Sequence, residues 1–229
     1  MLKIEEFVTP SPEQWEIVIK GMRNPKNSWD RMDSKLYIDA IFDLGDNDET
    51  LAMSLVDGGP VHAKFRRMLP VHVTIDAPLY WWKEFDTYKV GTVANSCSTM
   101  HKIHSKEFTI ENFSTDRLID DEDLTLYYGE WITPLDILKE LTIPTLNNAR
   151  KMFLETKDDK ELKKKYWWQM IQLLPTSYNQ KRTIMLNYEV LANIYQWRRN
   201  HKLDEWHVVC DWIEKLPYSE LITGKKENE

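Results

Sequence analysis

The segment from Leu69 to His104 reads LPVHVTIDAPLYWWKEFDTYKVGTVANSCSTMHKIH. Its first part, Val71 to Asp76, alternates apolar with polar residues. A period of two predicts a half-buried β-strand. Ala77 and Pro78 follow, and proline is favoured at the first position of a helix. The pattern therefore predicts a strand over Leu69–Asp76 that leads directly into a helix.

The predicted helix is short and aromatic, from Pro78 to about Lys89, and a polar loop, Gly91 to Thr99, follows it. Two interpretations fit this order. A strand, a helix and a polar loop together are typical of a functional site held on a rigid frame. The same order also fits a plain strand–helix corner with a capping loop.

Composition limits the class of protein. The chain has 229 residues with 42% hydrophobic and 29% charged residues, which indicates a folded chain with a substantial core. The net charge of −7 and the lack of a basic stripe argue against nucleic-acid binding. Ten tryptophans predict mainly core or interface packing, and the alternative is a surface that stacks a flat ligand.

Compartment and membrane signals point to the cytoplasm. Cys97 and Cys210 lie far apart in the chain, which does not suggest a disulfide framework. The N-terminus lacks the apolar core of a signal peptide, and no run approaches the ~18 apolar residues that a membrane span needs. We therefore expect a cytoplasmic protein without a membrane partner.

Further helices are predicted from capping and periodicity. Ser11-Pro12-Glu13-Gln14 has the form of a capping box at the start of a helix that ends near Met22. The other predicted helices cover Lys35–Leu44, Glu49–Val56, Thr145–Thr156, Asp158–Leu174, Tyr178–Asn200 and Asp204–Lys215, with a further one opening at Thr133. We expect one domain over residues 1–222 and a disordered tail over residues 223–229.

The Tyr178–Asn200 segment is expected to be the longest helix. Leu186, Val190, Ile194 and Trp197 form an apolar stripe at helical spacing. Arg198 shares a face with apolar residues, so its guanidinium needs an anion or other acceptors. The alternative is an arginine that reaches the solvent near the end of the helix.

No metal site is predicted. His101 and His104 are three residues apart and could share a helix face, but no third ligand has suitable spacing. The acidic run Asp120–Asp123 is more typical of a solvated surface than of an ion site.

Ordered blocks between His62 and Leu216 resemble the flavin-dependent thymidylate synthases, the ThyX family. The first blocks are Gly59-Pro60-Val61-His62, the strand that follows Phe65, and Ala77-Pro78. The later blocks are Asn95-Ser96-Cys97-Ser98 and Leu174-Pro175, then Asn187, Asn193 and Arg198 at the spacing of the family. The long-range spacing carries the resemblance, because each block alone is weak.

The sequence also departs from the family pattern. Thr87-Tyr88-Lys89 occupies the positions of the Arg-His-Arg signature, and Ser96 occupies that of a glutamate. Family arginines are replaced by Met100, Ile171 and Glu189, and a glutamine is replaced by Glu84. These changes remove residues suited to phosphate binding, since the guanidinium fork pairs with phosphate oxygens. Nearby cations that could compensate are Lys64, Arg66, Arg67, Lys83, Lys89 and Lys102.

The resemblance implies an α+β fold, with a central, mostly antiparallel sheet, many surrounding helices, and a homotetramer. It implies reductive methylation of dUMP to dTMP with FAD, methylenetetrahydrofolate and NADPH, and so a pyrimidine nucleotide as partner. Implied cofactor contacts are His62, Thr87, Tyr88, Lys89, Asn187 and Asn193. Implied substrate contacts are Glu84, Ser96, Ser98 and Arg198, with Arg198 also the catalytic cation.

Two other hypotheses stay open. The lost arginines favour a catalytically inactive ThyX-like oligomeric scaffold, because several charge-assisted phosphate contacts are missing. The third hypothesis is a flavoprotein that acts on a different nucleotide. A direct test of flavin and nucleotide binding distinguishes the three hypotheses.

Overall fold

The chain folds into two compact units in the computed structural model, which describes residues 2–119, 124–127 and 131–224. Unit 1 comprises Met1–Lys3, Asp76–Asp86 and Ser96–Arg182, and unit 2 comprises Ile4–Ile75, Thr87–Asn95 and Thr183–Glu229. The expectation of one domain over residues 1–222 stays a prediction. The expected C-terminal tail falls mostly outside the described residues, as does the acidic run Asp120–Asp123.

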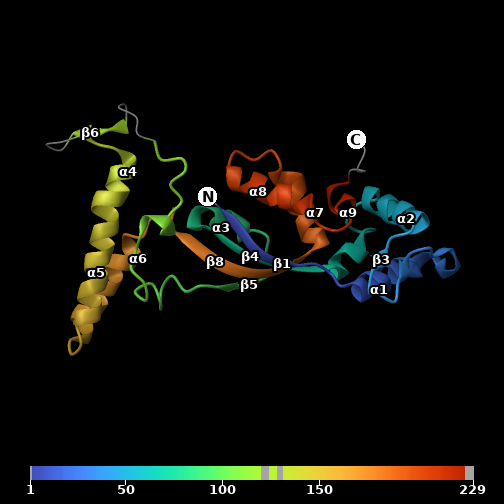
Figure 1. Ribbon diagram of the computed structural model, residues 1–229, viewed down its shortest axis with the longest axis horizontal. Coiled ribbons are helices and arrows are strands. Elements are labelled where there is room, and N and C mark those ends of the chain that lie inside the picture. Colours follow the sequence, from blue (N-terminus) through green and yellow to red (C-terminus); the bar gives the residue numbers. More distant parts are fainter. Residues whose placement is uncertain (1, 120–123, 128–130, 225–229) are drawn as a thin grey trace. The chain divides into compact units, whose positions relative to one another are not determined.

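A four-stranded sheet has the order β1-β4-β8-β5 (Figure 1). The strands are β1 (Lys3–Val8), β4 (Pro70–Pro78), β5 (Val93–Ser96) and β8 (Asn179–Asn187). β4 confirms the strand predicted from the alternating segment, because Val71, Val73 and Ile75 are buried. On the other face, the hydroxyls of Thr74 and Thr183 lie 2.9 Å apart and join β4 to β8.

Helices and short hairpin strands make up the rest of unit 2. The helices are α1 (Pro12–Met22), η1 (Asn24–Lys26), η2 (Trp29–Arg31), α2 (Asp46–Asp57), η3 (Lys64–Met68), α7 (Tyr188–Arg198), α8 (Asp204–Ile213) and α9 (Glu220–Thr223). The hairpin consists of β2 (Lys35–Leu36) and β3 (Phe42–Asp43). The predicted capping box of α1 is confirmed, since Ser11 and Gln14 bond each other's backbone N–H groups. Trp15 packs edge-on against Tyr188 and Tyr218, which joins α1 to the C-terminal part of the unit.

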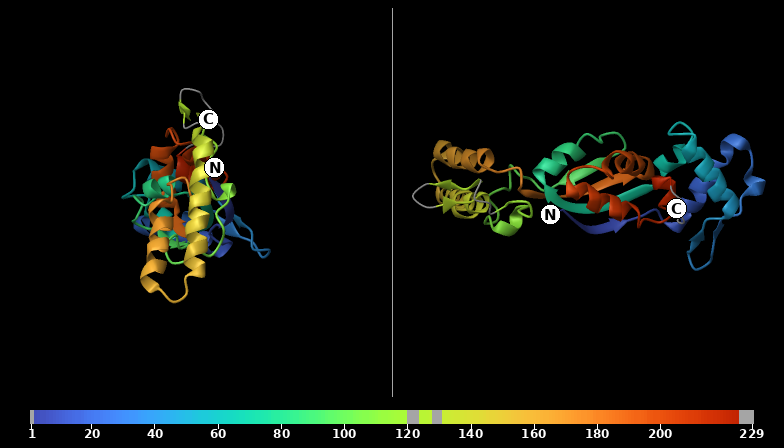
Figure 2. Two further views of the ribbon diagram at one scale, coloured as in Figure 1. Left: turned by 90° about the vertical axis from the view of Figure 1, so that its left-hand side faces the viewer. Right: turned by 90° about the horizontal axis from the view of Figure 1, so that it is seen from above.

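Unit 1 contains a helical hairpin, α5 (Ile143–Glu155) and α6 (Lys160–Gln172), whose helices lie side by side (Figure 2). Its other elements are α3 (Leu79–Phe85), η4 (Ile110–Asn112), β6 (Leu126–Tyr127), β7 (Trp131–Ile132), α4 (Pro134–Asp136) and η6 (Ile137–Thr142). The hairpin has its own core, in which Leu146 and Met170 are fully buried with Phe108 and Phe113. This unit therefore has an apolar centre of its own.

Three local predictions were wrong. Lys35–Leu44 forms the β2–β3 hairpin and not a helix. The expected helix over Tyr178–Asn200 is strand β8 followed by α7, and Ile184 and Leu186 are buried with strand alternation. Pro78 ends β4 and caps α3 instead of occupying its first turn. In each case pairing with another strand decided the conformation over local propensity.

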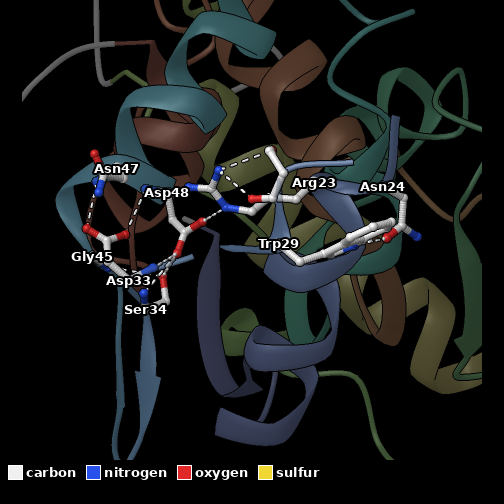
Figure 3. Close-up of polar contacts among 9 residues, drawn as sticks. Arg23, Asn24, Trp29, Asp33, Ser34, Gly45, Asn47 and Asp48 are labelled. Atoms are coloured by element: carbon white, nitrogen blue, oxygen red, sulfur yellow. Dashed lines mark hydrogen bonds and ion pairs between the residues drawn. The ribbon is translucent and has the colours of Figure 1, made fainter. Parts of the chain in front are cut away.

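A buried ion pair fixes the connection between α1 and α2 (Figure 3). The Arg23 guanidinium bonds Asp48, and the side chains are 3% and 0% exposed. The other carboxylate oxygen of Asp48 accepts bonds from the Ser34 hydroxyl at 2.6 Å and the Ser34 N–H at 2.8 Å. Asp33 in turn accepts from the N–H groups of Asn47 and Asp48 and so caps the first turn of α2. One carboxylate thus holds the end of α1, the segment before β2 and the start of α2 together.

We predict that Asp48→Asn lowers the free energy of unfolding by about 3 kcal/mol, because it leaves the buried Arg23 without its counter-ion. Urea unfolding monitored by tryptophan fluorescence measures the loss. Asp46→Asn is the matched control, since Asp46 is an exposed carboxylate in the same helical turn. Its expected loss is about 0.5 kcal/mol. Equal losses for the two variants would contradict the structural role of Asp48.

The titration of Asp48 predicts a loss of folding stability in acid. Burial alone would raise the pKa of its carboxyl, but hydrogen bonds from Ser34, Arg23 and Asp33 outweigh burial and lower the pKa below 3.8. A carboxyl whose pKa is lower in the folded state than in the unfolded state stabilises the fold at any pH above its unfolded-state pKa. This stabilisation is lost as the pH falls through the folded-state pKa. The stability difference between the wild type and Asp48→Asn should stay constant from about pH 7 to about pH 5 and shrink below about pH 4. A difference that grows on acidification would contradict this assignment.

Candidate functional site

Unit 2 contains a pocket of about 1070 Å³. Its walls come from the end of α2 and the turn after it, from η3, from the Val90-Gly91 turn, from one face of α7 and from the end of α9. This volume lies at the upper end of the range for small-molecule and cofactor sites. A nucleotide or a flavin ring is of a size that such a space can hold.

Asn187 sets the position of α7 on the pocket. Its backbone is still extended, and its side-chain oxygen accepts a hydrogen bond from the Val190 N–H at 3.1 Å. Asparagine is a preferred N-cap for this reason. The next residue, Tyr188, is buried, donates its N–H to the Leu69 carbonyl and donates its hydroxyl to the Pro217 carbonyl. The helix therefore starts at a fixed point, and its polar face, including Asn193, lines the pocket.

An ion pair forms part of the pocket wall. Arg66 Nε and Nη2 each lie 2.8 Å from Glu189 Oε2, and Arg66 Nη1 donates to the Leu221 carbonyl at 3.3 Å. The two side chains are 7% and 18% exposed. The pair thus fixes η3 against the first turn of α7 and also neutralises the carboxylate in the pocket lining.

Gly91 lies against the start of α7. Its φ of +79° lies in the left-handed region that favours glycine. A Cβ atom there would lie 3.1 Å from Asn187 Nδ2 and 3.2 Å from Val190 Cγ2. The missing side chain therefore lets the 87–93 segment approach the cap of α7 closely.

Arg198 is held by aromatic side chains. Its Nε donates to the Tyr88 hydroxyl at 2.9 Å, and its guanidinium lies 4.8 Å from the centre of the Trp206 ring. Tyr88 and Trp206 also contact each other edge-on. The described pocket lining includes Arg199 but not Arg198. Arg198 thus ties the 87–89 segment to α7 and α8.

The other predicted site residues divide between the units. Unit 2 holds His62, Thr87, Tyr88, Lys89, Asn187, Asn193 and Arg198, and of these Asn187 and Asn193 line the pocket. Unit 1 holds Glu84, Ser96 and Ser98. The Ser98 hydroxyl accepts from the N–H groups of Met100 and His101, which organises the local turn. The assigned roles of all these residues stay predictions.

Several pocket residues were absent from the sequence prediction. Gln196 lies on the same exposed side of α7 as Asn193, and Arg199 and Asn200 directly follow the helix. Gln196 and Asn200 come three and seven residues after Asn193, and this was a usable signal, because such spacing places amides on one side of a helix.

Tyr195 lines the pocket as a neutral phenol. Burial, followed by the hydrogen bond that its hydroxyl donates to Glu214, raises the pKa of Tyr195 to about 12. A phenol with this pKa stays protonated at neutral pH and does not act there as a general base. Tyr195 therefore offers the pocket a ring surface rather than proton-transfer chemistry.

The described part of the chain has neither a cluster of metal ligands nor a membrane-spanning helix. Across residues 2–119, 124–127 and 131–224, no group of three or more His, Cys, Asp or Glu side chains is arranged to hold a metal ion. Among the helices in the described part of the chain, none is both long and apolar enough to cross a membrane.

The chain is similar in structure to a flavin-dependent thymidylate synthase and to a UMP/dUMP methylase. Two crystal structures of thymidylate synthase X (ThyX) from Helicobacter pylori with FAD and dUMP match it with TM-scores of 0.60 and 0.59. Both are 14% identical and match over 97% of this chain and 97% and 98% of theirs. The UMP/dUMP methylase PolB from Streptomyces cacaoi, bound with 5-Br dUMP, matches with a TM-score of 0.55 and 14% identity, over 93% of this chain and 88% of its own.

Sequence comparison gives no relative. No protein-family model matches the chain, and neither does any curated protein. The structural likeness shows that the fold is ThyX-like, α+β and rich in helix around an antiparallel sheet, which confirms the predicted fold class. At 14% identity it shows the fold and nothing about the reaction.

We predict that Gly91→Ala destabilises the protein more than Gly59→Ala. Both glycines have positive φ values, +79° and +86°, so alanine costs about 1–2 kcal/mol at either position. Only at Gly91 does the new Cβ press on Asn187 and Val190, whereas nothing lies within 4 Å of it at Gly59. Asn187 cannot yield without loosening the cap of α7. Urea unfolding of both variants tests this, and equal losses would show that the Gly91 contact is unimportant.

Proposed function

We propose that this protein is a diverged flavin-dependent enzyme that methylates a pyrimidine nucleotide. The reaction that we assign to it is the reductive methylation of dUMP to dTMP, with methylenetetrahydrofolate as carbon donor and NADPH as reductant. The observation that carries the proposal is the pocket of about 1070 Å³ beside α7, which Asn187 and Asn193 line. The ThyX-like fold of the chain supports the same choice.

The residues in the pocket suit the proposed ligands chemically. Asn187, Asn193 and Gln196 present amides, which both donate and accept hydrogen bonds and so match the edges of a flavin or a uracil ring. Arg67 and Arg199 present guanidinium groups, which match phosphate oxygens. Bound FAD would supply the redox chemistry, while these side chains bind and orient the ligands.

The chain's own residues would orient the ligands and exclude water. The Arg66–Glu189 pair holds the wall of the pocket, and Gly91 allows its turn to approach Asn187 closely. We assign the remaining contacts of the proposed site as follows. The flavin would meet His62, Thr87, Tyr88 and Lys89, and Arg198 would act on the base of the nucleotide.

A second candidate function is a non-catalytic ThyX-like scaffold. One observation favours it: the guanidinium of Arg198 is already engaged with Tyr88 and Trp206. A residue that activates a bound base must instead face the ligand in the pocket. In the enzyme hypothesis, ligand binding therefore has to release Arg198 from Tyr88.

Absorption spectroscopy separates these functions. The purified protein is titrated with FAD, then with dUMP, and the flavin band is followed. A band that co-elutes with the protein and shifts on addition of dUMP supports the methylase. A bound flavin that dUMP does not affect indicates a flavoprotein for another nucleotide. If neither ligand binds at high micromolar concentration, the scaffold is the correct function. In a separate assay with all substrates present, formation of dTMP would exclude the scaffold.

We predict that Asn193→Ala weakens FAD or dUMP binding about tenfold, because it removes one or two hydrogen bonds inside the pocket. Asn148→Ala, which removes an exposed amide from α5, is the matched control and should change neither affinity. Titration calorimetry measures both ligands. Unchanged affinities in Asn193→Ala would place the ligands outside this pocket.

A further inference from the structure

The pocket carries an excess of positive charge although the family signature is lost. Its described lining includes three guanidinium groups, Arg66, Arg67 and Arg199, against one carboxylate, Glu189. Arg66 is paired with Glu189, so these two charges compensate each other inside the wall. The charge that remains for a ligand comes from Arg67 and Arg199.

These two arginines lie at opposite ends of α7. Glu189 is in the first turn of the helix, and Arg199 directly follows its last residue. The ten residues from Glu189 to Arg199 correspond to about 15 Å along the helix axis, because an α-helix rises about 1.5 Å per residue. Arg66 and Leu69 both bond the start of α7, so η3 and its Arg67 belong to the N-terminal end. Between the two ends the helix presents the amides of Asn193 and Gln196.

The two ends differ in their electrostatics. The N-terminus of a helix carries a partial positive charge, and the C-terminus carries a partial negative charge. An anion is therefore favoured at the Arg67 end, whereas the helix dipole opposes it at the Arg199 end. The N–H groups of Tyr188 and Val190 already bond Leu69 and Asn187. The guanidinium of Arg67, rather than the backbone, must then make the main contact with the anion.

We propose that Arg67 binds the phosphate group of the nucleotide, in place of the arginines missing from Thr87-Tyr88-Lys89. The Arg66–Glu189 pair acts as the positioning element, since it holds η3 and removes the repulsion that a bare Glu189 would exert on a phosphate. This inference rests on the proposed function for the identity of the nucleotide but not for the anion site.

Arg67 is well suited to this task. It is exposed, and its only described hydrogen bond is a long one, 3.4 Å, from Nη2 to the Pro60 carbonyl. This contact orients the guanidinium toward the turn that forms the pocket wall. A charge-assisted, two-pronged contact with phosphate is stronger than that bond and would replace it.

The test compares dUMP with deoxyuridine, which lacks the phosphate, by titration calorimetry at one salt concentration. In the wild type, dUMP should bind at least tenfold more tightly than deoxyuridine. Arg67→Gln should weaken dUMP binding tenfold or more and leave deoxyuridine unchanged. Arg67→Lys should restore part of the difference, because it keeps the charge but not the fork.

Arg31→Gln, which removes an exposed cation outside the pocket lining, is the control and should not change dUMP affinity. Arg199→Gln tests the competing assignment at the other end of α7 and should weaken dUMP binding less than Arg67→Gln does. If Arg199→Gln abolishes the preference for dUMP and Arg67→Gln does not, the inference is overturned. It is also overturned if Arg67→Gln weakens deoxyuridine equally, since that outcome indicates a damaged pocket.

Inorganic pyrophosphate separates failure of this inference from failure of the proposed function. If dUMP does not bind the wild type, the proposed function fails. Thermal stabilisation by pyrophosphate that is lost in Arg67→Gln and kept in Arg199→Gln would still support the anion site. Absence of binding for both dUMP and pyrophosphate would overturn both.

Discussion

The abrupt change from strand to helix at Asn187 is the constraint on which unit 2 depends. β8 ends at this residue and α7 begins at the next, with the Asn187 side chain capping the first turn. Tyr188 fixes the same point through bonds to the carbonyls of Leu69 and Pro217 and through its ring contact with Trp15. One short junction therefore joins the sheet, α1, α7 and the C-terminal segment, and it sets the register of every α7 side chain in the pocket.

The ion pair in the pocket wall joins residues that lie far apart in the sequence. Arg66 and Glu189 are 123 positions apart but share one carboxylate oxygen inside the wall. Glu189 stands at a position where the resemblance implies an arginine, so a carboxylate on α7 and a guanidinium from η3 now occupy this wall together. A buried pair of this kind adds specificity of position more than stability, because desolvation offsets much of its attraction. The Arg23–Asp48 pair has a comparable role at the other end of the unit.

Tyr88 gives the altered signature a structural role. Its hydroxyl accepts from Arg198, and its ring packs against Trp206, so the segment at positions 87–89 is attached to α7 and α8. In a chain with an arginine or histidine here, the same site would carry a charge beside Arg198. The aromatic residue removes that repulsion, which explains how the fold tolerates the loss of the signature. It also engages the one cation that the resemblance identifies as catalytic.

The sequence by itself determined the elements whose signals are local. The alternation over Val71–Ile75 predicted β4, the capping box at Ser11 predicted α1, and the ordered blocks predicted the α+β class. The resemblance to the ThyX family also pointed to Asn187 and Asn193, and both line the pocket. Only the tertiary structure decided that residues 179–187 form a strand, because this segment pairs with β4 and β5 in the sheet. Only the tertiary structure brought Arg66, Gly91, Glu189 and Arg199 to one cavity, since packing joins segments more than 100 positions apart that no local pattern connects.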